Sequence, residues 1–498
     1  MPKINAPVRV RFAPSPTGHM HLGSARTALY DYLIAKKTGG RFILRIEDTD
    51  RKRFVEGTED ELIQGMRWLG IEWDEGPDKG GDYGPYRQSE RKEIYLDHSR
   101  KLIEMGMAYY CFCSQDRLEK VKQQKQANKE IPHYDGTCRT IDPRMAEQRV
   151  KNGEPHVIRF KSPREGTTII NDFIRGEIII ENRNLDDFIL IKSDGWALYH
   201  LAATVDDHLM NITHVIRGSE WLSTFPLHSL IHRAFGWEEP IWVHLSVFLK
   251  PSGKGKMSKR DAENLIKDGH SIFVKDLQGL GYTPEGVVNW IALMGWSYDD
   301  HTEFFSMDDF VDKFTLDRLN PSPAAINFTK LDYFNKEHIK ALSSTELAKR
   351  IKPFFIDKGY TVDDSTLEKI APIIKERITT LDDAVDISSF FFKNDFLYDV
   401  ERLKIEGLTI FETVKIGKEI VNELSKLADM SVGPAELAMQ SLLEKLHLTP
   451  KQVFTFMREA ISAQRVTPPL FESMAILSKD EVIRRITKAI DFLESVPK

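Results

Sequence analysis

Cysteine is scarce in this chain, whose 498 residues include only three, at positions 111, 113 and 138. So odd and sparse a set argues against a framework of disulfide bonds. No stretch approaches the roughly 20 apolar residues of a membrane-spanning helix, and the first residues carry no apolar run suited to a signal peptide. Internal repeats and low-complexity tracts are also lacking. We therefore expect a cytoplasmic protein with no membrane partner.

An excess of positive charge is lacking as well. The composition is ordinary for an enzyme, with 41% hydrophobic residues, 29% charged residues and a net charge of −6. An acidic total does not point to a nucleic-acid partner, so any RNA binding must depend on local basic surfaces. A chain of this length is too long to fold around a single hydrophobic core, so we expect about three to five domains.

A proline-bounded turn carries the first candidate site residues. Residues 8–12 alternate like a strand and lead into the run Pro14-Ser-Pro-Thr-Gly-His-Met-His-Leu-Gly-Ser24. Apolar residues at helical spacing then predict a helix that starts at Ser24, a suitable N-cap, and stops at Gly39-Gly40. The next strand is expected over residues 41–46. This βαβ pattern directs the turn to the strand ends where doubly wound sheets bind nucleotides.

A basic loop, Lys256-Met-Ser-Lys-Arg260, lies far along the chain, just after Gly253 and Gly255. Alone, such a charge run is usually a solvated loop. Paired with the turn, it offers imidazole, ammonium and helix N-terminal N–H groups to one polyanion. An ATP triphosphate needs this combination when charge develops during attack on its α-phosphate. The two segments together predict a site for ATP.

Seven short runs, in a fixed order, carry a resemblance to a known family. They are Ala13-Pro-Ser-Pro-Thr-Gly18, Leu22-Gly-Ser-Ala-Arg-Thr-Ala28, Arg45-Ile-Glu-Asp-Thr-Asp-Arg51, Tyr134-Asp-Gly-Thr-Cys-Arg139, Val205-Asp-Asp-His208, His214-Val-Ile-Arg-Gly218 and Lys256 to Arg260. In these runs the chain resembles the class I aminoacyl-tRNA synthetases, and among them the glutamyl-tRNA synthetases. The second half matches more loosely, chiefly at Pro468-Pro-Leu-Phe-Glu472.

The resemblance implies a multidomain architecture of α/β plus all-α type. A Rossmann-like nucleotide-binding catalytic domain is expected in two halves, residues 1–108 and 193–262. Between them we expect an inserted α+β domain that binds the acceptor stem, residues 109–192. A connector that contacts the tRNA stem follows over 263–335, and a helical anticodon-binding region over 336–498.

The implied activity is ATP-dependent ligation of L-glutamate to tRNA(Glu) through glutamyl-adenylate, with AMP and pyrophosphate as products. ATP is expected with Mg²⁺. No protein nucleophile is required, so catalysis would depend on positioning and charge stabilisation. The expected partners are tRNA(Glu), L-glutamate and ATP, and we expect a monomer.

The family's nucleotide site carries over residue by residue. His21, Lys259 and Lys256 match its catalytic positions, and Lys259 is expected to stabilise the pyrophosphate leaving group. The implied ATP-binding residues are Pro14, Ser15, Thr17, Gly18, His21, Leu22, Gly23, Ser24, Met257, Ser258, Lys259 and Arg260.

Glutamate carries two carboxylates and one ammonium, so a selective pocket needs fixed cations and one anion. The implied glutamate-binding residues are Arg11, Ser15, Glu47, Tyr199 and Arg217. Bidentate pairing with a carboxylate explains arginine at two of these positions, and Glu47 would face the substrate ammonium. A purely structural Arg11–Glu47 pair and a core role for Tyr199 are the alternatives.

The three cysteines, with Tyr134, resemble a zinc site found in part of the family. Structural zinc takes four ligands, and Tyr134 with Cys111, Cys113 and Cys138 would supply them; His133 is an alternative fourth ligand. Three reduced thiols without a metal are the other interpretation. Any zinc would brace the insertion against the acceptor stem.

Contacts to tRNA are expected from two groups of basic residues. Lys120, Lys122, Lys125 and Lys129 either contact phosphates or form a solvated helix face. In the helical half, Arg377, Arg458 and Arg465 are candidates for the anticodon, because arginine reads base edges and stacks on bases.

Other functions stay open at this point. A non-discriminating enzyme would also charge tRNA(Gln) with glutamate. A tRNA-modifying glutamyl transferase is disfavoured by the long helical C-terminal region. A nucleotidyltransferase acting on a small metabolite would be much shorter, and a non-catalytic RNA-binding protein would be expected to have lost His21 or Lys259.

Overall fold

A computed structural model describes residues 7–496 of the chain apart from 51–52, 54, 256 and 258–264. The chain divides into two compact units. The first contains the residues up to Leu277 together with Val288–Phe328, and the second contains Gln278–Val287 and the residues from Thr329 onward. Within the described residues, no helix combines the length and apolar character needed to cross a membrane.

Strands and helices alternate through the first part of the chain, as the predicted α/β class requires. In order they are β1 (Arg9–Phe12), α1 (Leu22–Thr38), β2 (Arg41–Leu44), α2 (Thr58–Trp68), α3 (Lys92–Glu104), β3 (Ala108–Cys111), α4 (Gln115–Ala127), α5 (Pro143–Lys151), β4 (Val157–Phe160), β5 (Thr167–Asp172), β6 (Gly176–Glu181), β7 (Ile189–Ile191), α6 (Tyr199–Leu209), β8 (His214–Gly218), α7 (Phe225–Phe235), β9 (Ile241–Leu245), β10 (Phe248–Leu249), α9 (Val274–Gly279), α10 (Pro284–Leu293), α11 (Met307–Lys313) and β11 (Ala324–Ala325).

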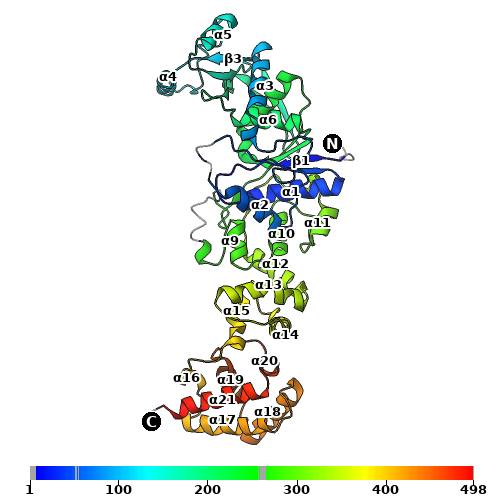
Figure 1. The fold of residues 1–498 in the computed structure, drawn as a ribbon, viewed down its shortest axis with the longest axis vertical. Helices are drawn as coiled ribbons and strands as arrows, with labels where there is room; N and C mark the ends of the chain where they lie inside the picture. Colours follow the sequence, from blue (N-terminus) through cyan, green and yellow to red (C-terminus); the bar gives the residue numbers. More distant parts are fainter. Residues whose placement is uncertain (1–6, 51–52, 54, 256, 258–264, 497–498) are drawn as a thin grey trace. The chain divides into compact units, whose positions relative to one another are not determined.

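The predicted βαβ unit is present, with β1 and β2 paired in parallel and α1 between them in sequence. Figure 1 shows α1 beside β1, with α2 close by. As predicted, α1 stops at the glycine pair, where Gly39 takes a left-handed φ of 64° that its missing Cβ permits. This unit delivers the turn after β1 to the sheet edge.

A second sheet lies beside the β1–β2 pair and has the strand order β6-β5-β9-β8, with β8 and β9 parallel. Strand β1 lies against the start of β8, because Thr213 N–H donates to the Arg9 carbonyl at 2.9 Å. The carboxyl ends of β1 and β8 therefore point to one edge. Strands β5 and β6, from the predicted insertion, join this sheet through the parallel pairing of Asp172 with Trp242.

The remaining part of the predicted insertion forms an antiparallel sheet of its own, in the order β3-β4-β7. Helices α4 and α5 accompany it (Figure 1). The lysines expected either to contact phosphates or to form a solvated helix face lie on or just after α4, none of whose residues is buried. Its lack of an apolar face makes it a solvent-exposed helix.

The second unit is helical, which confirms the predicted all-α region. Its helices are α12 (Phe328–Ala341), α13 (Ser344–Asp357), α14 (Asp364–Ile374), α15 (Asp383–Ser388), α16 (Val400–Leu403), α17 (Ile410–Ser425), α18 (Val432–Leu446), α19 (Pro450–Ser462), α20 (Leu470–Leu477) and α21 (Lys479–Glu494). Proline marks two helix starts in this unit: Pro450 is the first residue of α19, and Pro468-Pro469 precede α20.

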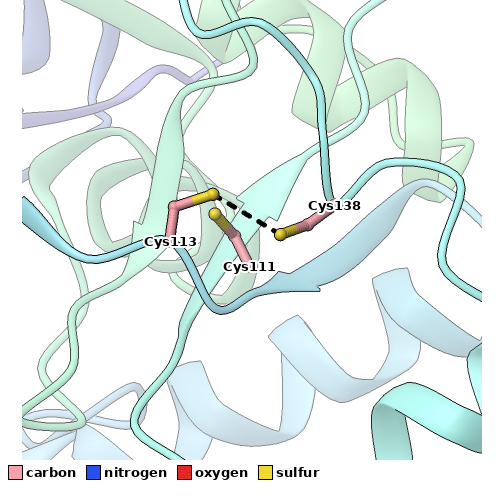
Figure 2. Close-up of side chains that lie close together, drawn as sticks. All are labelled: Cys111, Cys113 and Cys138. Atoms are coloured by element: carbon pink, nitrogen blue, oxygen red, sulfur yellow. Dashed lines mark hydrogen bonds between the residues drawn. The ribbon is translucent and has the colours of Figure 1, made fainter. Parts of the chain in front are cut away.

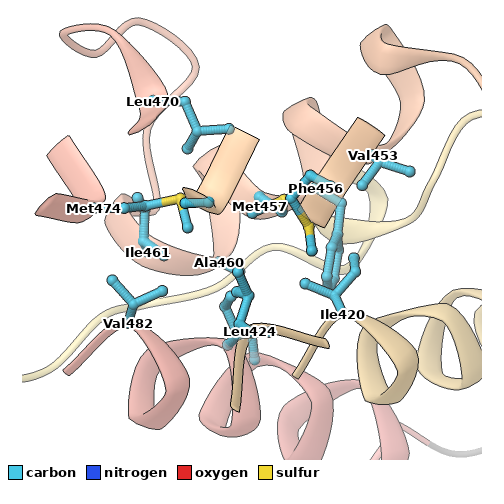
Figure 3. Close-up of a cluster of buried hydrophobic side chains, with 14 of the residues drawn as sticks. Ile420, Leu424, Val453, Phe456, Met457, Ala460, Ile461, Leu470, Met474 and Val482 are labelled. Carbon is cyan, nitrogen blue, oxygen red and sulfur yellow. The ribbon is translucent and has the colours of Figure 1, made fainter. Parts of the chain in front are cut away.

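One apolar cluster unites the last helices of this unit. Figure 3 shows Phe456, Met457 and Ala460 of α19 among side chains of α17, α20 and α21. Phe456 is 1% exposed and Met457 is fully buried. Burial of such side chains stabilises by about 1.5–3 kcal/mol each, so this cluster contributes to the stability of the region.

Candidate active site

A cavity of about 1070 Å³ lies in the first unit, at the carboxyl ends of β1 and β8. The predicted residues on its wall are Arg11, Pro14, Ser15, His21, Leu22, Gly23, Ser24, Glu47, Tyr199, Arg217 and Met257. Thr17 and Gly18 do not line it. Lys256, Ser258, Lys259 and Arg260 lie outside the described residues. Residues far apart in sequence thus meet where the topology predicts a nucleotide site.

His21 caps the helix that opens onto this cavity. Its Nδ1 accepts hydrogen bonds from the backbone N–H groups of Gly23 and Ser24, at 3.0 and 3.3 Å. The expectation that Ser24 is the N-cap is wrong: the imidazole already satisfies these N–H groups, and α1 starts at Leu22. A Cβ on Gly23 would lie 2.9 Å from the His21 ring, so only glycine permits this approach. The cap places an imidazole at the end of a helix that favours anions.

Arg11, on β1, is buried and has a carboxylate partner. Its Nε donates to Asp207 Oδ1 at 2.9 Å, and its Nη1 donates to the Ile216 carbonyl at 3.5 Å. Burial lowers the pKa of Arg11, but the charge of Asp207 together with the other acidic groups nearby outweighs that effect, and the pKa is raised. The charge of this guanidinium is therefore compensated inside the protein.

A second arginine, Arg45, extends this ion network to the predicted ammonium-binding residue. Arg45 is fully buried, and its Nη1 donates to Asp207 Oδ1 at 2.7 Å. Its Nη2 donates to Glu47 Oε1 at 3.0 Å. Burial raises the pKa of Glu47 despite the charges of Arg45 and Arg11. The direct partner of Glu47 is thus Arg45, and that of Arg11 is Asp207.

Arg217, on β8, is equally buried but has only neutral partners. Its Nε donates to His244 Nε2 at 3.0 Å, and its Nη1 lies 3.2 Å from His228 Nε2 and 3.3 Å from the Tyr199 hydroxyl. Its Nη2 is buried without a hydrogen-bond partner, and no carboxylate lies within ion-pair distance, among the residues that the structure describes. Burial lowers the pKa of Arg217. This wall of the cavity therefore presents an uncompensated cation.

Tyr199 occupies the cavity wall rather than the protein core. Its ring packs against Trp221, with centroids 4.4 Å apart, and both residues line the cavity. Burial raises the pKa of its hydroxyl, so the group stays protonated near neutral pH. A neutral phenol beside Arg217 donates or accepts one hydrogen bond without cancelling the charge.

Several residues of this site had no sequence-based role. Arg26 lines the cavity, donates from Nη1 to the Met294 carbonyl at 2.7 Å and lies 4.1 Å from the Phe248 ring. His228 and His244 surround Arg217. A histidine on an apolar helix or strand is usually a buried core residue, so only the strand order reveals their position. Asp207, in contrast, belongs to the Val205-Asp-Asp-His208 run that marked the resemblance.

The predicted metal-binding residues also come together. The sulfur atoms of Cys111, Cys113 and Cys138 lie within 4.8 Å of one another, and Figure 2 shows them converging. The Tyr134 hydroxyl lies 3.4 Å from Cys111 Sγ and 3.3 Å from Cys113 Sγ. Burial raises the pKa of Cys113 to about 11, helped by the neighbouring thiols. His133 is not part of this group.

The basic residues expected to contact tRNA differ in their surroundings. Lys120, Lys122 and the other lysines of this group lie in the α4 region, which has no buried residue in the helix itself. In the second unit, burial and the nearby charge of Arg377 lower the pKa of Arg458. Arg458 Nε donates to Thr467 Oγ1 at 3.0 Å. The charge of Glu459 acts in the opposite direction on the pKa of Arg458.

Comparison with known proteins places the chain in a family. Residues 7–333 match the family described as tRNA synthetases class I (E and Q), catalytic domain, and residues 346–490 match the anticodon binding domain family. The chain therefore belongs to the class I tRNA synthetases of the E and Q type.

The individual relatives indicate which amino acid, within this class, the similar enzymes use. The glutamate–tRNA ligase of Dehalococcoides mccartyi is 40% identical over 98% of each chain, and that of Chloroflexus aurantiacus is 40% identical over the full length of both. A crystal structure of a glutamate–tRNA ligase from Elizabethkingia meningosepticum, in complex with its amino acid, matches with a TM-score of 0.89 at 36% identity, over 98% of this chain and 100% of that one. These matches confirm the resemblance to the glutamyl-tRNA synthetases.

Proposed function

We propose that this protein activates L-glutamate with ATP and transfers it to tRNA(Glu) for protein synthesis. The observation that carries the proposal is Arg217, whose uncompensated guanidinium faces the cavity into which α1 also opens. A buried cation without an anionic partner suits a substrate carboxylate. The helix N-terminus beside it suits a phosphate chain.

The chemistry has two steps. A carboxylate oxygen of glutamate attacks the α-phosphorus of ATP, the bond to the β-phosphate breaks, and pyrophosphate leaves with the electron pair. The 2′-hydroxyl of the terminal tRNA ribose then attacks the carbonyl carbon of the mixed anhydride, and AMP leaves. Both steps depend on alignment and on stabilising the charge of the leaving group.

Glutamate recognition is assigned to the walls of the cavity. Arg217 with Tyr199 would hold the side-chain carboxylate, and Glu47 would face the ammonium group. Arg11 and Ser15 would complete the pocket near the α-carboxylate. Since Arg45 already holds Glu47 by one oxygen, the second oxygen stays available to a substrate donor.

ATP binding is assigned to the turn and the start of α1. Residues Pro14, Ser15, His21, Leu22, Gly23 and Ser24 line the cavity from this side, and Met257 from the other. Thr17 and Gly18 are assigned to shaping the turn. Lys259 and Lys256, with Ser258 and Arg260, would stabilise pyrophosphate as it leaves. Magnesium would neutralise phosphate charge when ATP binds.

A structural zinc ion is assigned to Cys111, Cys113, Cys138 and Tyr134. The donor set suits it, because thiolates bind zinc strongly and structural sites are four-coordinate. Zinc would replace the hydrogen bonds among these groups with a rigid centre. Elemental analysis of the purified protein tests this: about one zinc per chain is expected, with a loss of zinc in Cys113→Ser.

The second unit is assigned to the anticodon, in line with its match to the anticodon binding domain family. Arg377, Arg458 and Arg465 are proposed contacts, since paired guanidinium groups favour phosphates and bases. We further propose that the enzyme acts as a cytoplasmic monomer. The matched anticodon domain disfavours a tRNA-modifying transferase.

Charging assays test the proposed function. Purified protein is given L-glutamate, ATP and Mg²⁺ with tRNA(Glu) or with tRNA(Gln). Charging of tRNA(Glu) alone supports a discriminating enzyme, and charging of both supports the non-discriminating alternative. Charging of neither, with an active control synthetase, contradicts the proposal.

A Lys259→Ala variant tests the nucleotide site in the same assay. Adenylate formation should fall far more than glutamate affinity, because the lysine would act on the leaving group. Equal effects on both parameters would contradict its assigned role.

A further inference from the structure

A chain of hydrogen bonds runs from Arg217 away from the cavity, toward the hairpin β5–β6. Arg217 and His244 are register partners on the parallel strands β8 and β9. His244 is fully buried, and its Nδ1 lies 2.7 Å from Asp172 Oδ2. Asp172 is the last residue of β5, in the region predicted to be the insertion.

The partners of His244 determine which ring nitrogen carries the proton. Arg217 Nε always bears a hydrogen, so His244 Nε2 must accept and the proton must reside on Nδ1. That Nδ1–H donates to Asp172, which also accepts the His244 backbone N–H at 3.0 Å. If the ring carried its proton on Nε2, two donors would face each other across 3.0 Å. Asp172 therefore selects the tautomer that Arg217 needs.

Asp172 itself is fixed on every side. Its other oxygen, Oδ1, accepts the backbone N–H groups of Ile174 and Arg175, at 3.1 and 2.9 Å. With the two bonds from His244, four donors hold the carboxylate, and it is 3% exposed. A carboxylate that accepts from four donors is held in one orientation.

We propose that Asp172, acting through His244, is a positioning residue that orients the Arg217 guanidinium for the side-chain carboxylate of glutamate. This inference rests on the proposed function, because it presupposes that Arg217 binds glutamate. The negative charge sits one imidazole away from the guanidinium. It therefore orients Arg217 without occupying the face that the substrate needs. The hairpin β5–β6 thereby contributes to amino-acid recognition.

Two conservative substitutions of His244 separate positioning from packing. In His244→Gln the amide oxygen can take the place of Nε2 and still accept from Arg217. In His244→Asn the amide can replace only the Nδ1 donor to Asp172, so Arg217 loses its acceptor. Loss of a hydrogen bond to a charged group costs about 1.5–3 kcal/mol, roughly tenfold or more in binding. Asp172→Asn should resemble His244→Asn, because its amide can favour the wrong tautomer.

The experiment measures KM for L-glutamate and for ATP in tRNA(Glu) charging, with thermal unfolding alongside. We expect about tenfold or higher glutamate KM for His244→Asn and Asp172→Asn, a change within about threefold for His244→Gln, and an unchanged ATP KM. His214→Asn is the matched control, because His214 is another buried histidine, on β8, and does not line the cavity. It should lower the unfolding temperature without changing glutamate KM.

The outcomes distinguish the two proposals. A wild-type protein that does not charge glutamate contradicts the proposed function. If wild type charges glutamate and Arg217→Ala raises its KM, equal effects of His244→Asn and His244→Gln would overturn the positioning role. Unequal effects in the expected direction support it.

Discussion

Arg11 and Arg217 both line the cavity, and the protein surrounds these two buried cations with opposite kinds of partner. Arg11 and Arg217 are 4% and 5% exposed, so both are deeply buried. Arg11 is paired with Asp207 in a network of carboxylates, and its pKa is raised. Arg217 is surrounded by two imidazoles and a phenol, and burial lowers its pKa. Of these two arginines, only Arg217 has no carboxylate within ion-pair distance among the residues that the structure describes.

This difference shows that a binding site is defined by the charge that the protein leaves uncompensated. A guanidinium already paired with a carboxylate gains little from a second anion, since its desolvation has been offset. A guanidinium held by neutral acceptors is oriented but unsatisfied. The same residue type, on adjacent strands, is therefore paired with a carboxylate on one side and held by neutral partners on the other.

The largest expected effect comes from removing Arg45, which should disrupt the ion network around Arg11 and lower the free energy of unfolding. Arg45→Met leaves Glu47 buried without its ion-pair partner and Asp207 with Arg11 alone, and breaking a buried ion pair typically costs about 3–5 kcal/mol. The free energy of unfolding of the first unit, followed by urea denaturation, should fall by about this amount. Arg41→Met is the control, because Arg41 is 62% exposed in its side chain, and it should cost less than about 1 kcal/mol. Similar losses for both variants would show that the ion network does not stabilise the fold.

As the pH falls, the histidines around Arg217 should lower the free energy of unfolding before the carboxylates around Arg11 do. Burial lowers the pKa of His228 and His244 below the ordinary value of 6.5, and lowers that of His200 to about 4. The unfolded chain binds protons below pH 6.5 and the folded protein does not, so stability falls as pH drops from 6.5 toward 4. The pKa of Asp207 is lowered from 3.8, so its contribution is lost only below that pH.

The histidine contribution can be isolated with one variant. Between pH 6.5 and 4, wild type should lose more unfolding free energy than His244→Gln, by at most about 1.4 kcal/mol per pH unit. Urea denaturation at a series of pH values measures the difference. Parallel pH profiles for the two proteins would mean that His244 is not held neutral by the fold.

The smallest expected effect comes from replacing Thr204, which tests whether His228 helps to position Arg217. Its hydroxyl donates to the His200 carbonyl at 2.7 Å and so accepts from His228 Nδ1 at 3.1 Å. Thr204→Val removes that acceptor at nearly constant volume, at a cost of about 1–2 kcal/mol, and should raise glutamate KM several-fold. Thr204→Ser keeps the hydroxyl and should behave as wild type. A valine variant with unchanged KM would remove His228 from the set of groups that position Arg217.

Much of the fold follows from local sequence signals. The alternating run before Pro14, the helical spacing after it and the glycine pair at its end predict the βαβ unit, because each signal acts within a few residues. The expected N-cap at Ser24 is wrong, since the His21 imidazole accepts the N–H groups of Gly23 and Ser24 and the helix therefore starts earlier, at Leu22. The helical second half follows from periodicity and proline positions.

The site was accessible to sequence reasoning only in part. Arg11, Arg217 and Glu47 came from the resemblance, not from spacing. His244 lies 27 residues from Arg217 and 72 from Asp172, and only the strand order makes them neighbours. No local pattern encodes that order. The same holds for the pair of Arg45 and Asp207, which lie 162 residues apart.

The most direct test compares Arg217→Gln with Arg11→Gln in one tRNA(Glu) charging assay. We predict that Arg217→Gln raises glutamate KM by at least about tenfold more than Arg11→Gln does, because the charge of Arg11 is already shared with Asp207 and that of Arg217 is not shared with a carboxylate among the residues that the structure describes. Arg11→Gln should instead lower the unfolding temperature more strongly. Equal increases in glutamate KM, or a larger one for Arg11→Gln, would contradict the account.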